Sequence, residues 1–140
     1  MRSSHTLIIL RLLTATLALA AQADITGWNG QPWGSPKPPS GDTIHDYRQD
    51  GVVYEVKLTF DPKHGLTKVT LAAPDDRESF QKALAALTAR YGRPTLRSEY
   101  DGDTETTGTT WEWTKPHGKA TLSADNSGSY SQFILTFERR

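Results

Sequence analysis

Apolar and polar residues alternate along most of the chain from residue 43 onward, which is the period of a β-strand with one buried face. The clearest case is 52–60, VVYEVKLTF, where every second residue from Val52 to Phe60 is apolar. Residues 43–49 precede it across Asp50-Gly51, a dipeptide typical of two-residue hairpin turns. These segments predict a β-hairpin, and 66–72, LTKVTLA, continues it as a third strand.

One stretch has the helical period instead. Pro74 ends the third strand, Asp75 stands in a capping position, and Glu78 follows three residues later in capping-box spacing. The single apolar stripe that follows consists of Phe80, Ala83, Leu84, Leu87 and Tyr91. Gly92 suits the position just past a helix, and Pro94 blocks its continuation. The pattern predicts one amphipathic helix that ends near residue 91.

Strand patterns return after this helix, at 95–100, 109–114, 119–125 and 130–139. The order β-β-β-α-β-β-β-β, with short connections, favours antiparallel neighbours. We therefore predict an α+β fold, with a single twisted antiparallel sheet of six or seven strands and the helix packed on one face.

Trp111 and Trp113 in TTWEWT lie two residues apart, so a strand would point both to one face. The intervening residues, Thr110, Glu112 and Thr114, suit a solvated face. We predict that the two tryptophans pack under the helix as core residues. An exposed aromatic platform for a sugar or peptide is the alternative, and it requires the helix to cover the other face.

The N-terminal residues predict export. Arg2 is followed by an apolar stretch to Ala21, and Ala21-Gln22-Ala23 fits the small-x-small cleavage rule. We predict a signal peptide at 1–23, a flexible Gly/Pro/Trp-containing leader at 24–42 and one α+β domain at 43–140. The predicted location is periplasmic or secreted, with no membrane anchor after cleavage.

Composition excludes several classes of function. The chain has no cysteine, which removes thiol nucleophiles, thiolate metal sites and disulfides. It has 16 basic and 16 acidic residues, and the absence of a basic stripe argues against nucleic acid. No phosphate-binding glycine loop is present, so no cofactor is predicted. The histidines at 45, 64 and 117 are far apart in sequence, and no nucleophile-elbow motif occurs.

An acidic segment raises the question of calcium. Asp101, Asp103, Glu105 and Glu112 occupy positions 1, 3, 5 and 12 of an EF-hand-like count. Position 6, which needs glycine for the sharp turn, is Thr106, and the flanking segments are predicted strands. The pattern favours an acidic hairpin loop, with calcium binding as the alternative.

The leader contains the remaining tryptophans, Trp28 and Trp33. Either they fold back onto the domain, or they form a docking motif, since tryptophan is a favoured interface anchor. The sequence therefore predicts an exported, non-catalytic binding module whose partner is a protein or peptide of the cell envelope or extracellular space. The alternatives are an inhibitor of a hydrolase, acting through the loop 101–108, a hydrolase, or a calcium-dependent carbohydrate binder.

Overall fold

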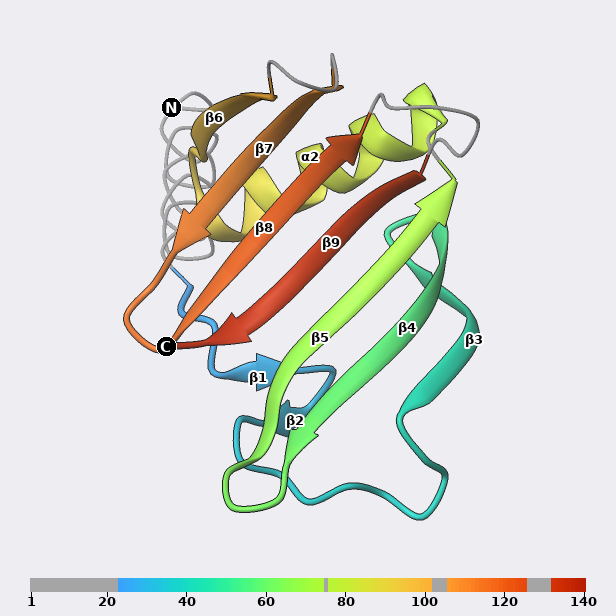
Figure 1. The fold of residues 1–140 in the computed structure, drawn as a ribbon, viewed down its shortest axis with the longest axis vertical. Coiled ribbons are helices and arrows are strands. Elements are labelled where there is room, and N and C mark those ends of the chain that lie inside the picture. The colour runs from blue at the N-terminus through green and yellow to red at the C-terminus, as the bar shows by residue number, and fades with distance from the viewer. Residues whose placement is uncertain (1–22, 75, 102–105, 126–131) are drawn as a thin grey trace, which may run out of the picture.

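The computed structural model of the chain describes residues 23–74, 76–101, 106–125 and 132–140. Its main element is a seven-stranded sheet in which every neighbouring pair is antiparallel, in the order β3-β4-β5-β9-β8-β7-β6. The strands are β3 (Thr43–Gln49), β4 (Val52–Asp61), β5 (Gly65–Pro74), β6 (Thr95–Asp101), β7 (Thr106–Thr114), β8 (Gly118–Asp125) and β9 (Gln132–Arg139). One helix of the described residues, α2 (Arg77–Tyr91), lies across a single face of the sheet (Figure 1). The predicted α+β class is confirmed, and so is the element order from residue 43 onward, while a small two-stranded sheet of β1 (Gly27–Trp28) and β2 (Gln31–Pro32) precedes it.

The helix divides the sheet into two groups of strands. β3, β4 and β5 pair in sequence order, and α2 then carries the chain across to the opposite edge, where β6 begins (Figure 1). β7, β8 and β9 each pair with the strand before them, and β9 returns to pair with β5. The last strand in the sequence therefore joins the two groups at the middle of the sheet.

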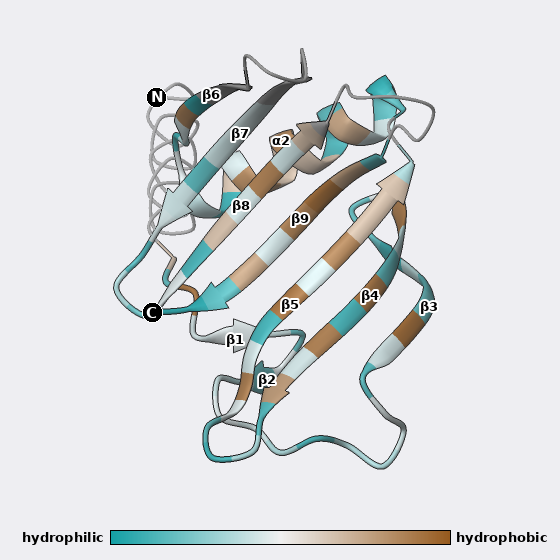
Figure 2. Ribbon diagram, in the orientation of Figure 1, coloured by the Kyte–Doolittle hydropathy of each residue, from teal (hydrophilic) through white to brown (hydrophobic). Residues whose placement is uncertain are grey.

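The face under the helix carries the core. The register aligns Val56, Leu71, Leu135, Leu122 and Trp111 in one row across five strands, and the next row contains Leu58, Val69, Phe137, Ala120 and Trp113. Phe80 of α2 packs edge-on against Phe133, with ring centroids 5.6 Å apart. Figure 2 shows the apolar and polar residues alternating along β4, β5 and β9. The period-two pattern thus has the physical cause that the sequence suggested, one buried face and one wet face.

The paired tryptophans of β7 belong to this core, as predicted. Trp113 is 2% exposed, and its indole N–H donates to the carbonyl of Gly92 at 2.8 Å. Trp111 is partly buried, and its ring lies 5.1 Å from that of Phe80. The helix covers the same face as both rings, so the platform alternative does not describe this molecule.

Helix α2 begins and ends close to where the sequence predicts, with one correction at its N-terminal cap. Asp76 caps the first turn in place of Asp75, because its carboxylate accepts from the Glu78 N–H at 3.0 Å and from Ser79 Oγ at 3.0 Å. Glu78 pairs instead with Lys82, at 3.2 Å. Gly92 ends the helix with φ 92°, a backbone conformation that a residue with a Cβ rarely adopts.

Candidate functional site

The segment that precedes the sheet forms a small hairpin of its own. β1 (Gly27–Trp28) pairs with β2 (Gln31–Pro32) in an antiparallel arrangement. Asn29 and Gly30 connect them with φ values of 49° and 77°, as expected for an Asn-Gly turn. The composition of 24–42 predicts no such element, although the Asn-Gly dipeptide is a recognised hairpin signal.

Backbone hydrogen bonds connect this segment to the main sheet. The Gly34 N–H donates to Leu66 O at 3.0 Å, and the Leu66 N–H donates to Ser35 O at 2.9 Å. A Cβ on Gly65 would lie 2.2 Å from Gly34 O, so the two backbone segments can approach this closely only at a glycine. These contacts join the segment predicted as a flexible leader to the main sheet, and the domain boundary at residue 43 stays a prediction.

The hairpin covers apolar surface that the helix leaves open. A helix is only about 10 Å wide, whereas strands of about ten residues run for about 33 Å. Trp28 is 6% exposed in the core cluster, with its ring centroid 5.2 Å from that of Tyr47. Ile25 is 1% exposed in the same cluster. Burial of these apolar side chains is the physical reason for the segment to fold against the sheet.

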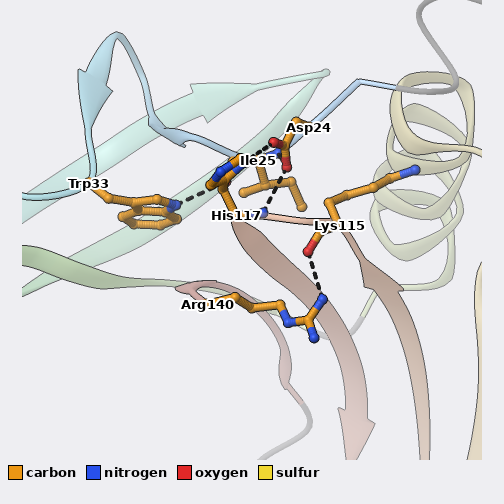
Figure 3. A network of polar contacts seen from close by, with 6 residues as sticks. All are labelled: Asp24, Ile25, Trp33, Lys115, His117 and Arg140. Atoms are coloured by element: carbon orange, nitrogen blue, oxygen red, sulfur yellow. Dashed lines mark hydrogen bonds and ion pairs between the residues drawn. The ribbon is translucent and has the colours of Figure 1, made fainter.

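This segment contacts the β7–β8 turn through four residues that we call the anchor cluster (Figure 3). They are Asp24, Ile25, Trp33 and His117. The Trp33 indole N–H donates to Ile25 O at 2.9 Å. One oxygen of the Asp24 carboxylate accepts from the His117 backbone N–H at 3.1 Å, and the other contacts His117 Nδ1. The side-chain hydrogen bond from His117 is the main cause that lowers the pKa of Asp24.

The turn itself is shaped to receive the anchor cluster. A Cβ on Gly118 would lie 2.4 Å from Ile25 O, so a glycine is needed at this contact. Arg140 Nη1 donates to Lys115 O at 2.9 Å, and the Arg140 N–H donates to His117 O at 3.1 Å (Figure 3). The turn is therefore held both by the N-terminal segment and by the residue after β9.

Two adjoining hollows open beside the β1–β2 hairpin, and together we call them the hairpin cleft. Their volumes are about 330 and 290 Å³, and they share Gly27, Trp28, Asn29 and Tyr91 as lining residues. The larger is also lined by Gln31, and the smaller by Tyr47, Gln49 and Arg90. The cleft thus combines side chains from the hairpin, β3 and the C-terminal end of α2.

A β-bulge places Tyr47 in this cleft. The pairing of β3 with β4 shifts between Ile44 and Tyr47, and Asp46 has φ 53°. The extra residue lets Ile44 and Tyr47, three positions apart, both pack against the core cluster. Glu55 supports the bulge, since its carboxylate accepts from the Asp46 N–H at 3.2 Å and contacts His45 Nδ1. Strict alternation along 43–49 could not predict this position.

The polar groups of the cleft include hydroxyls, amides and a guanidinium. The Tyr47 hydroxyl donates to Asn29 Oδ1 at 3.3 Å. The Arg90 guanidinium lies 5.9 Å from the ring centroid of Tyr91 and 3.8 Å from the Asp50 carboxylate. Burial raises the pKa of the Tyr91 hydroxyl, and the charge of Arg90 opposes that rise.

One polar atom of the cleft has no partner. Gln31 Oε1 is buried and accepts no hydrogen bond from the described residues. A buried acceptor left unpaired costs about 1–3 kcal/mol, because it has lost its water without replacement. A ligand that donates a hydrogen bond to this oxygen, once the Gln31 side chain turns toward the hollow, would remove that cost.

The histidines of the described residues each contact a carboxylate, in the pairs His45–Glu55, His64–Asp61 and His117–Asp24, on three different elements. None of these histidines lines the hairpin cleft. Within the described ranges, no three His, Asp or Glu side chains gather closely enough to hold a metal ion.

The residues singled out by sequence fall in different places. Trp28 lines the hairpin cleft, whereas Trp33 belongs to the anchor cluster. Asp103 and Glu105 lie outside the described residues, as do the side chains of all residues in the loop 101–108. Glu112 pairs with Arg97 Nε at 3.4 Å. Tyr47, Gln31 and Arg90 were not identified from the sequence, because no motif marks them.

Comparison of the chain with protein-family models, with curated proteins and with solved structures gave no match. In the part of the chain that the structure describes, α2 is too short and too polar to cross a membrane.

Proposed function

We propose that this protein is an exported, non-catalytic binding module that holds its ligand in the hairpin cleft. The observation that carries this proposal is the hollow lined by Gln31, Trp28 and Tyr91, in which the Gln31 side chain has an oxygen, Oε1, without a partner among the described residues. Ligand sites are typically concave, with aromatic walls and a few placed polar groups. Export rests on the signal-peptide pattern of residues 1–23, and its consequence is a periplasmic or secreted protein.

The leading prediction from the sequence is a protein or peptide partner, which a sheet edge or the tryptophans of the leader would engage. At the β3 edge, the bulge between Ile44 and Tyr47 interrupts the regular row of backbone groups that a partner strand would need, whereas the β6 edge has no such shift in its pairing with β7. Trp28 argues against the docking motif as well, since its ring is buried within the molecule. Hydrolase inhibition through the loop 101–108 stays a prediction from sequence.

The test uses the protein beginning at Asp24, labelled with ¹⁵N, and three fractions of a bacterial envelope: soluble proteins, solubilised glycans and small molecules. We expect one fraction to shift the backbone resonances of Gly27, Asn29 and Tyr91, with its component recovered chemically unchanged. Shifts confined to the opposite face of the sheet, for example at Thr121 and Thr136, would move the site elsewhere. Conversion of a component into product would show an enzyme and overturn the proposal.

A further inference from the structure

We infer that the ligand of the hairpin cleft is a neutral carbohydrate chain. This inference rests on the proposed function and names the ligand class of that same site. It follows from three properties of the cleft: its aromatic walls, its amide groups and the carboxylates beside its single cationic side chain among the described residues.

The aromatic walls suit the less polar face of a sugar ring. A pyranose presents a patch of C–H groups on one face, and such a patch packs against an aromatic ring while the hydroxyls point outward. Tyr47 and Tyr91 are partly exposed, and they line the smaller hollow on elements far apart in sequence. Tyrosine also offers a hydroxyl beside its apolar ring, which allows both kinds of contact at once.

The polar groups select a ligand that can donate hydrogen bonds. Gln31 Oε1 is an acceptor without a partner in the described part of the chain, so the group that meets it must carry an O–H or N–H. A carboxylate or phosphate only accepts hydrogen bonds and cannot satisfy it, whereas a sugar hydroxyl both donates and accepts. Asn29 and Gln49 add two further amides to the cleft, and amides match hydroxyls in both roles.

The charge of the cleft also favours a neutral ligand. Among the described residues, Arg90 is the one cationic side chain that lines the two hollows, and the Asp50 carboxylate lies 3.8 Å from it. The Asp24 carboxylate, which lines the larger hollow, contacts His117 and would repel an anion. An anionic ligand would have to compete with this carboxylate for the guanidinium. A hydroxyl can accept from Arg90 without separating the pair.

The experiment titrates the protein beginning at Asp24 with maltohexaose, cellohexaose and tetra-N-acetylchitotetraose, followed by calorimetry and by ¹⁵N resonances. We expect at least one oligosaccharide to bind and to shift Gly27, Asn29 and Tyr91. Gln31→Met keeps the side-chain length but removes the acceptor, and Tyr91→Ala removes a wall. Each should weaken binding about tenfold or more, equivalent to 1.4 kcal/mol.

Two matched controls separate binding from folding. Tyr91→Phe retains the ring and should keep most of the affinity, and Thr121→Ala on the opposite face should leave it unchanged. Melting temperatures of all variants identify any loss that comes from unfolding, and Gln31→Met serves if Tyr91→Ala fails to fold. Binding that both Gln31→Met and a folded Tyr91→Ala leave unaltered would overturn the inference.

The outcomes also distinguish this inference from the proposed function. If no oligosaccharide binds but an envelope peptide or protein shifts the cleft resonances, the binding module stands and the carbohydrate assignment falls. If no envelope fraction and no sugar shifts them, both fall.

Discussion

Trp111 and Trp113 lie on the same face of β7 but differ in depth. Trp113 is 2% exposed, and its indole N–H donates a hydrogen bond to the carbonyl of Gly92 at the end of the helix. Trp111 is only partly buried, against Phe80. We expect Trp113→Ala to lower the free energy of unfolding by about 3–5 kcal/mol, as for a large core residue. Trp111→Ala should cost clearly less. Urea unfolding measures both, and equal losses would contradict the difference in packing.

Tyr54 makes the molecule sensitive to alkali. It is 2% exposed, and burial, with a smaller effect of Asp50, raises its pKa to about 12. The unfolded value is about 10, so the stabilisation is complete below pH 10 and is lost as the pH rises from about 10 to 12. Urea unfolding at pH 9 and pH 11.5 should show a larger fall for the wild type than for Tyr54→Phe. Equal falls would mean that other groups cause the alkaline loss.

Asp24 makes the stability of the folded protein sensitive to acid. Hydrogen bonds, first that from the His117 side chain, hold its pKa below the usual value. A lowered pKa gives stability that is full above the unfolded value of about 3.9 and is lost as the pH falls through the folded value. Asp24→Asn should therefore melt below the wild type at pH 5, and the gap should close near pH 2. A gap that persists at pH 2 would show that the ionised carboxylate is not the cause.

At the scale of elements, the hairpin segment should behave as part of the core. Removing residues 24–42 takes away the buried side chains of Ile25 and Trp28. We expect this deletion to lower the melting temperature strongly, and Trp28→Ala alone to cost about 3–5 kcal/mol. Trp33→Phe loses the hydrogen bond to Ile25 O together with part of the packing of the indole ring, and it should cost at least about 0.5–1.5 kcal/mol. Pro39→Ala, in an exposed stretch of the same segment, serves as the control.

The elements that the sequence predicted are those long enough to have a period. The ten residues of β4 and the fifteen of α2 repeat their apolar positions several times. β1 and β2 have two residues each, so no period can exist, and only Asn29-Gly30 marks their turn. The bulge in β3 was missed for a related reason, because one extra residue changes the face of everything after it.

At the scale of the whole molecule, the candidate site could not be read from the sequence because three separate elements build it. Trp28, Tyr47 and Tyr91 come from the hairpin, β3 and α2, and only the tertiary fold brings them to one cleft. In the sequence, residue type alone marks Trp28 as a candidate site residue, whereas Tyr91 stands out only as part of the apolar stripe of the helix. Gln31 is recognised as a candidate site residue because its side-chain oxygen is buried without a partner among the described residues, and this property exists only in the folded chain.

The central position of β9 has a consequence for biosynthesis. Residues 132–139 are the last strand in the sequence, and they fill the middle of the sheet between β5 and β8. While a ribosome is still making them, β5 and β8 each have an unpaired edge, and such edges invite pairing with other chains. The nascent chain should therefore depend on chaperones until its last residues emerge. A chain that ends before residue 132 should aggregate, which sedimentation of the truncated protein would detect.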